Sequence, residues 1–290
     1  MSQTTKPARS KTLVAKRASR PSKAALPFPI NIEAMVHWYR QELEQHPDEM
    51  HFQAMADFVA LLVHAGKNDL AFEFVERFVA LQDSNASYLG IELIQVLAEQ
   101  EGSEDEARKL APWVETFFDT DATIDGLPCE PYLVIAETTH DPDDIRTARK
   151  HVLAMTHDGD IACGRFRLWR LDGNSTDLAK VRAHIRSHGE GAVFIGIGLT
   201  KLTQRPDDFQ ACCNAMAVHL HDIPDEFVQQ TLLRELMDVV PIMLSTDITH
   251  VISSLRQSGA QAGSQLVITQ LEQALAQRPT QRVNSLAETN

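Results

Sequence analysis

The chain has 290 residues, of which 43% are hydrophobic and 6% aromatic, and its net charge is −13 at pH 7. This length can bury a sizeable core, either in one extended domain or in two compact ones. No run of about 18 apolar residues occurs, which argues against a transmembrane helix. The four cysteines, two of them adjacent, fit a reducing compartment better than a disulfide framework. We therefore expect a cytoplasmic protein.

Residues 1–26 form a basic arm without a single acidic residue. The arm carries a charge of +7, so the remainder of the chain is near −20. It is rich in Ser, Thr, Ala and proline, and it cannot bury enough apolar surface to offset the entropy lost on ordering. We therefore predict that residues 1–30 are disordered. The basic residues of the arm are Lys6, Arg9, Lys11, Lys16, Arg17, Arg20 and Lys23.

Four interpretations of the basic arm stay open. It can serve as a solubilising tail that folds back on the acidic body, or as a contact to nucleic acid or an anionic lipid surface. It also has the acid-free composition of an organellar transit peptide, although its prolines interrupt any long amphipathic helix. A signal for a dedicated secretion machine is the fourth interpretation. The absence of a long apolar core argues against an ordinary secretory signal.

Helical periodicity begins after the arm. Residues 31–49 place apolar side chains on one helical face and stop at Pro47, which predicts a leading helix. Residues 58–81 and 90–118 then each show two apolar helical stretches around a turn glycine. In both, an alanine follows five residues after that glycine, Ala71 after Gly66 and Ala107 after Gly102. Glycine there closes the first helix in a left-handed conformation, and alanine lets the two helices approach.

Three later segments repeat this plan without relying on the glycine. An acidic residue, an apolar residue and, after two more, a small or medium apolar residue recur at Asp144 to Ala148, Asp177 to Val181 and Asp208 to Cys212. We interpret these acids as helix starts that cap the helix or complement its dipole. The small residues in all five segments, here called the marker residues, are Ala71, Ala107, Ala148, Val181 and Cys212.

The marker residues are spaced by 36, 41, 33 and 31 residues, and the 41 includes a turn-rich insertion at 119–131. A period near 34 with two helices per unit is the signature of a helical solenoid. The pattern resembles the tetratricopeptide-repeat family on residues 66–71 and 102–107, and more loosely over residues 50–225. The resemblance implies an all-α fold, a right-handed superhelical solenoid of about five antiparallel helix pairs. Residues 226–277 read as C-terminal capping helices, and residues 278–290 as a frayed tail.

The chain offers little chemistry for catalysis. It contains no nucleophile elbow, phosphate-binding loop, zinc-protease motif or paired CxxC, so we expect no enzyme, no metal and no cofactor. The G-x-G at Gly196 and Gly198 reads as small residues at a tight helix contact. Cys212 and Cys213 read as inert buried thiols. In "GRFRLWRLDG" (164–173), Phe166 and Trp169 read as core with arginines around the rim, and a contact to nucleic acid or a partner protein is the alternative.

The resemblance also implies a partner-binding groove lined by the first helix of each pair. Counting back from the marker residues gives a groove that is acidic in the second and third units and basic in the fourth and fifth, suited to an extended peptide of opposite polarity. We expect the chain to be a non-catalytic scaffold, adaptor or chaperone that binds a protein or peptide. The alternative is a nucleic-acid-associated regulatory factor that uses the basic arm while the solenoid recruits a partner. The predicted groove residues are Gln53, Ala56, Glu92, Val96, Glu99, Glu137, His140, Arg170, Phe194 and Lys201.

Overall fold

The computed structural model describes residues 31–47, 50–81, 86–118, 127–222, 226–258 and 262–278. Within these ranges the fold is all-α, as predicted, with fourteen α-helices and no strand. The arm at 1–30, most of the insertion at 119–131 and all but the first residue of the tail at 278–290 lie outside the described residues.

The chain divides into two units, Met1–His46 and Pro47–Asn290. The first unit contains α1 (Ile32–Gln45), which begins at Asn31, whose side chain accepts a hydrogen bond from the backbone N–H of Ala34 at 3.0 Å. The helices of the second unit are α2 (Phe52–His64), α3 (Asn68–Ala80), α4 (Ala86–Glu99), α5 (Glu104–Glu115), α6 (Glu130–Thr139), α7 (Pro142–Ala154), α8 (Asp158–Asp172), α9 (Ser175–Arg186), α10 (Ala192–Thr203), α11 (Pro206–Asp222), α12 (Glu226–Val239), the 3-10 helix η2 (Val240–Ile242), α13 (Ser245–Gln257) and α14 (Ala262–Gln277).

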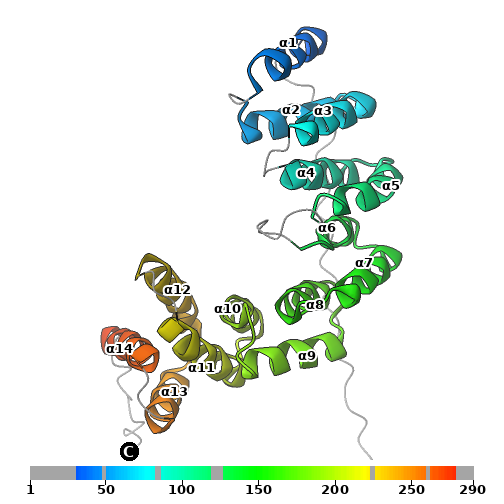
Figure 1. The fold of residues 1–290 in the computed structure, drawn as a ribbon. Helices are drawn as coiled ribbons and strands as arrows, with labels where there is room; N and C mark the ends of the chain where they lie inside the picture. The colour runs from blue at the N-terminus through cyan, green and yellow to red at the C-terminus, as the bar shows by residue number, and fades with distance from the viewer. Residues whose placement is uncertain are drawn as a thin grey trace, which may run out of the picture. The chain divides into compact units, whose positions relative to one another are not determined.

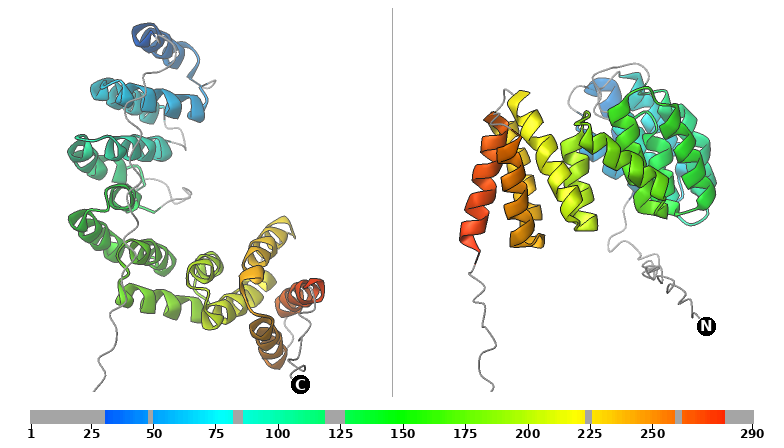
Figure 2. Two further views of the ribbon diagram at one scale, coloured as in Figure 1. Left: turned by 180° about the vertical axis from the view of Figure 1, so that it is seen from behind. Right: turned by 90° about the horizontal axis from the view of Figure 1, so that it is seen from below.

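The second unit is a chain of helices that pack against their neighbours in sequence. From α2 to α11 each helix contacts the next one, and from α2 to α14 each even-numbered helix also contacts the next even-numbered helix. Figure 1 shows α4, α6, α8 and α10 following one another along one side of this stack, with α5, α7, α9 and α11 along the other, and the left view of Figure 2 shows the same from behind. Such local contacts are typical of helical-repeat proteins.

All five marker residues are fully buried, each with 0% of its surface exposed. They lie on α3, α5, α7, α9 and α11, the second helix of each unit. A larger side chain at these positions would force the helices apart, because protein interiors are close-packed. The small-residue pattern therefore marks helix contacts, as the sequence predicts.

The turns between the paired helices come in two forms. Gly66 and Gly102 adopt positive φ, 71° and 86°, five residues before their marker residues. In the three later units the left-handed residue lies eight residues before the marker, at His140 (φ 54°), Gly173 (φ 71°) and Gln204 (φ 52°). The second helix of these units consequently starts three residues earlier, almost one helical turn. This extension explains why the later units lack a glycine at the expected position.

The helices from α8 onward share one hydrophobic core, and α14 closes it by packing against α11, α12 and α13. Gly196 and Gly198 of α10 lie at two close approaches within it. A Cβ atom on Gly196 would lie 3.1 Å from Cβ of Cys212, and one on Gly198 would lie 3.0 Å from the ring of Phe166. The G-x-G is thus a helix-packing feature, as predicted.

Candidate interaction surface

Three buried aspartates tie the odd-numbered helices together. Asp144, Asp177 and Asp208 are 8%, 2% and 4% exposed, and each is the third residue of its helix, α7, α9 or α11. A carboxylate with so little contact to water requires hydrogen-bond donors, because burying an unpaired charge is costly. In each case the principal donor is an arginine of the preceding odd-numbered helix.

In the three arginine–aspartate pairs, here called the ladder, the arginine donates through Nε and Nη2; Arg108 and Arg182 bind both carboxylate oxygens, and Arg149 binds one. Arg108 of α5 donates through Nε and Nη2 to Asp144, both at 2.9 Å. Arg149 of α7 donates to Asp177 at 3.1 and 2.9 Å.

The third pair joins Arg182 of α9 to Asp208 at 2.8 and 2.7 Å. A guanidinium that donates through two nitrogens holds a carboxylate in one orientation as well as at one distance. The ladder therefore fixes how α5, α7, α9 and α11 follow one another.

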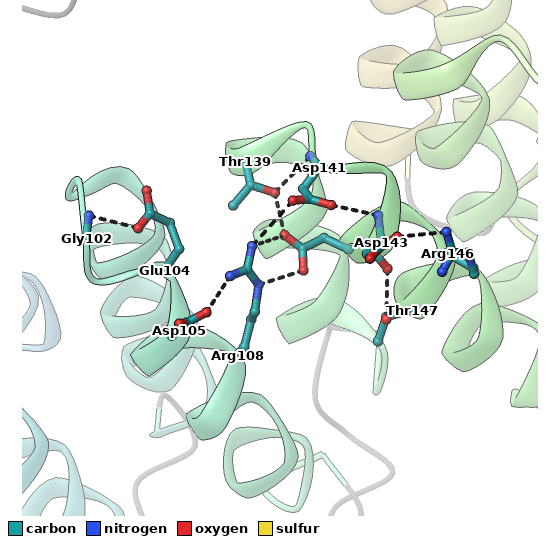
Figure 3. A network of polar contacts seen from close by, with 10 residues as sticks. Gly102, Glu104, Asp105, Arg108, Thr139, Asp141, Asp143, Arg146 and Thr147 are labelled. Atoms are coloured by element: carbon teal, nitrogen blue, oxygen red, sulfur yellow. Dashed lines mark hydrogen bonds and ion pairs between the residues drawn. The ribbon is translucent and has the colours of Figure 1, made fainter.

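A second group five residues before each aspartate completes the arrangement. Thr139 and Thr203 donate their hydroxyls to Asp144 and Asp208 at 2.7 and 2.8 Å. Figure 3 shows Arg108 reaching from α5 toward this turn, with Thr139 and Asp141 beside its guanidinium. In the middle pair Asp172 takes this place and accepts a hydrogen bond from Arg149 at 2.7 Å. The repeated turn thus presents polar atoms to the ladder in all three units.

The prediction that these aspartates mark helix starts is confirmed, since each is the third residue of its helix, but Asp144 and Asp177 do not cap α7 and α9. The capping residue of α7 is Asp141, which accepts from the backbone N–H of Asp143 at 2.7 Å. The capping residue of α9 is Asn174, which accepts from Thr176 at 2.9 Å. The aspartates lie three positions further on. There they still face the positive end of the helix dipole, but their carboxylates accept hydrogen bonds from arginine.

The charges of the ladder stabilise one another. Burial of Asp144 opposes its ionised form, but hydrogen bonds from Arg108 and Thr139 outweigh this effect and lower the pKa of the carboxyl. The hydrogen bond that Arg108 donates to Asp144 is in turn the largest influence on the arginine, and it raises the pKa of the guanidinium. Both groups are therefore ionised at neutral pH.

The even-numbered helices leave a separate row of side chains accessible. On α2, α8 and α10 it follows positions 18, 14 and 11 residues before the marker; on α6 only the first and last of these are accessible, because Val134 is buried, and on α4 the row is displaced by one residue and extends to Glu99. This spacing, with steps of four and three residues, is one face of a helix. We call this row the even-helix surface; its accessible members are Gln53, Asp57, Ala60, Tyr88, Glu92, Gln95, Glu99, Glu130, Glu137, Cys163, Arg167, Arg170, Phe194, Gly198 and Lys201.

Contacts between successive even-numbered helices support this assignment. Arg167 of α8 donates to Glu137 at 2.9 and 2.7 Å and to Glu130 at 2.7 Å, both of them on α6. Lys201 of α10 lies 3.3 Å from Glu235 and 4.0 Å from Asp238, both on α12. These residues therefore belong to one face that runs from helix to helix.

The predicted groove residues fall into three groups. Gln53, Glu92, Glu99, Arg170, Phe194 and Lys201 are exposed on the even-helix surface, with Phe194 63% exposed. Glu137 is there as well, half-buried in its contact with Arg167. Ala56 and Val96 are only 6% and 9% exposed and lie in the packing between helices, and His140 is the left-handed residue that ends α6.

The basic–aromatic segment 164–173 is mostly used within the fold. Phe166 and Trp169 pack against the core, with ring centroids 6.0 Å apart. Arg165 donates to Asp177 at 2.9 Å, and Arg167 binds the two glutamates of α6. Arg170 is exposed and forms no ion pair with a residue that the structure describes. Of the three arginines, Arg170 is thus the one that offers an uncompensated charge to a partner.

A further polar cluster joins α5, α6 and α7. The carboxylate of Glu115 accepts from the hydroxyl of Tyr132 at 2.8 Å and lies 3.0 Å from Nδ1 of His151, and the rings of Tyr132 and His151 stack with centroids 3.5 Å apart. Burial and the bond to Glu115 raise the pKa of Tyr132, which makes it a weaker acid. The cluster is better suited to holding three helices together than to transferring protons.

Within the described ranges, no group of three or more His, Cys, Asp and Glu side chains is arranged to hold a metal ion. No helix in the same ranges is long and apolar enough to cross a bilayer. All four cysteines are free, and Cys129, Cys212 and Cys213 are buried.

The sequence contains a signal for the ladder that marker spacing alone does not reveal. An arginine directly follows the marker in the second, third and fourth units, at 108, 149 and 182. An aspartate precedes the marker by four residues in the third, fourth and fifth units. This offset by one unit is what pairing between neighbouring units would produce.

Comparisons with protein-family models, curated proteins and solved structures find no match for the chain.

Proposed function

We propose that the chain is a non-catalytic scaffold, adaptor or chaperone that binds a partner protein or an extended peptide along the even-helix surface. One observation supports the proposal: five even-numbered helices, from α2 to α10, each present a strip of accessible side chains on one helical face. Helical-repeat proteins use such strips as extended binding surfaces. Free thiols throughout fit work in the cytoplasm.

The finer architecture is part of the same proposal. The short turns at residues 65–67, 100–103, 140–141, 173–174 and 204–205 suit antiparallel helix pairs. We place these pairs in a right-handed, tetratricopeptide-like solenoid with the even-numbered helices on its concave side. The glycine–alanine pairs at 66–71 and 102–107 support that placement.

Site-specific photo-crosslinking in cells tests the proposed function. A photoreactive amino acid is placed at Glu92 or Arg170 on the even-helix surface, and at Glu76 of α3 or Lys180 of α9 as matched exposed controls on odd-numbered helices. We expect adducts of defined mass from the first two positions only. Adducts confined to the odd-numbered helices, or none from any position, would contradict the proposal.

A second function, association with nucleic acid, is favoured by the acid-free charge of +7 in residues 1–26. Arm-driven binding to phosphates must weaken steeply with salt because it releases counterions. Full-length chain and a variant lacking residues 1–26 are compared for binding to a duplex DNA and a single-stranded RNA at several salt concentrations. Equal affinities for the two proteins would rule the second function out.

A further inference from the structure

The charges on the even-helix surface change sign along the stack. The first two helices contribute acids: Asp57 on α2, and Glu92 and Glu99 on α4. Asp57 accepts a hydrogen bond from Gln53, a neutral amide that leaves its negative charge in place, and Glu99 accepts one from Gln95. Glu92 is exposed and forms no ion pair within the described part of the chain. This end of the surface therefore attracts cations.

The middle of the surface is occupied by its own ion pairs. Glu130 and Glu137 of α6 share Arg167, whose side chain is 17% exposed. The hydrogen bonds that Arg167 donates to both carboxylates outweigh the effect of burial and raise the pKa of the guanidinium, so the cluster stays charged and paired. A ligand that crosses α6 gains little by bringing charges of its own, because the carboxylates already have a donor.

Beyond α6 one positive charge of this surface is available, that of Arg170. Arg170 is exposed and lies one turn after Arg167 on α8, without an ion pair to any described residue. On α10, Lys201 is shared with two acids of α12 at 3.3 and 4.0 Å. Arg170 is thus the strongest point of attraction for a carboxylate on this part of the surface.

From this arrangement we infer that the partner segment is a bipolar extended peptide, with a basic stretch over α2 and α4 and an acidic stretch at Arg170. The inference rests on the proposed function and adds the chemistry and register of its ligand. Glu92 and Arg170 are separated by two helix-to-helix steps, from α4 to α6 and from α6 to α8. Helices pack about 8–10 Å apart, so the separation is roughly 20 Å. An extended chain advances about 3.3 Å per residue, which places about six residues between the two charged stretches.

Synthetic peptides provide a direct test on the full-length chain. A bipolar peptide carries lysines at one end and glutamates at the other, around a neutral Gly/Ser spacer of about six residues. A basic peptide has lysines at both ends of the same spacer. The measured quantity is the ratio of their dissociation constants, by fluorescence anisotropy near 0.15 M salt, where the Debye length of about 8 Å suppresses the general attraction of the acidic body.

Arg170→Glu should shift this ratio toward the basic peptide by about three- to tenfold, because an exposed attraction becomes a repulsion of similar size. Lys180→Glu on α9 makes the same change in net charge on an odd-numbered helix and should leave the ratio unchanged. Glu92→Lys should weaken both peptides, and Glu76→Lys on α3 should weaken neither. Changing the spacer to about two residues should abolish the preference for the bipolar peptide.

Equal shifts for Arg170→Glu and Lys180→Glu would overturn the inference, since the effect would then be one of net charge. If the ratio of dissociation constants did not depend on spacer length, the inferred separation of the two charged stretches would be overturned. Either result leaves the proposed function standing if crosslinks still form at Glu92 and Arg170. Loss of those crosslinks would remove the proposed function itself.

Discussion

Breaking one pair of the ladder should destabilise the chain far more than breaking a surface ion pair. The cleanest pair is Arg182 with Asp208, because Arg108 also donates to Asp105 and Arg149 also donates to Asp172, whereas both side-chain hydrogen bonds of Arg182 go to Asp208. Replacing Arg182 by Met keeps most of the side-chain volume and removes the charge. Asp208, with 4% of its side chain exposed, is then left with a single hydroxyl donor.

The expected loss follows from burial. Removing one partner of a buried ion pair costs about 3–5 kcal/mol, because the other charge stays buried without compensation. Arg182 is 20% exposed, and a hollow of about 230 Å³ beside the pair admits solvent, so we expect a loss at or just below the lower end of this range, about 2–3 kcal/mol. A double variant, Arg182→Met with Asp208→Leu, should recover about 2 kcal/mol of that loss, since no buried charge remains.

Urea unfolding followed by far-UV circular dichroism measures the free energy, and hydrogen exchange in α9 and α11 localises the effect. Arg186→Met, one turn further along α9 and exposed, is the matched control and should change stability by less than about 0.5 kcal/mol. A loss below about 1 kcal/mol for Arg182→Met would refute the reasoning, because the pair would then behave like an exposed one. If the stability losses of Arg182→Met and Asp208→Leu simply added in the double variant, the two side chains would not be energetically coupled.

Three further predictions concern pH, packing and thiol chemistry. Folding lowers the pKa of Asp144 from 3.8, so the stability that this carboxylate contributes is complete above about pH 4 and is lost as pH falls through the folded value. Arg108→Met should therefore move the midpoint of acid unfolding, read by circular dichroism, to higher pH. An unchanged midpoint would contradict this. Gly164→Ala should lower the melting temperature, because the new Cβ would lie 2.6 Å from a methyl group of Val152. This clash should outweigh the helix propensity of alanine, which favours it over glycine by about 1 kcal/mol. A raised melting temperature would show that α7 and α8 can separate. Burial raises the pKa of Cys212 and of Cys129 to about 12, so a thiol reagent at pH 8 should modify Cys129, Cys212 and Cys213 only as fast as the chain unfolds, and rapid labelling of any of them in the folded protein would disagree.

The sequence predicts the helices well because helix faces and small packing residues recur locally. Marker residues such as Ala107 and Val181 identify buried contacts without any knowledge of what they touch. The pairing of Arg149 with Asp177 is harder to predict, since its members lie 28 residues apart and helix-capping patterns offer a simpler explanation for the acid. The shift of the turn to His140 and Gln204 is hidden as well, because positive φ at residues other than glycine leaves no mark in composition.

For the predicted groove residues too, local patterns are predicted well and long-range contacts are not. Projection from the marker residues finds Glu92, Arg170 and Lys201, which are exposed where the projection places them. The same projection includes Val96, which is buried, because on α4 the exposed row is displaced by one residue. Arg167 was assigned to the rim of a core, and only the fold brings it to the two glutamates of α6. Charges that are satisfied inside the stack cannot be separated from available ones by periodicity alone.

The residue directly after each marker shows how the odd-numbered helices are joined along the stack. In the first unit it is Phe72, whose ring lies 4.8 Å from that of Trp113 on α5. In the next three units it is the arginine of the ladder, and in the fifth it is Cys213, fully buried where α13 and α14 cover α11. The side chain at this position is therefore apolar where a helix or an aromatic ring covers it. It is charged where it faces the partly exposed turn before a buried aspartate of the next odd-numbered helix. Because the odd-numbered helices carry these links, the even-numbered helices can vary in charge without loosening the stack, and the reversal of sign between Glu92 and Arg170 is compatible with one uninterrupted fold.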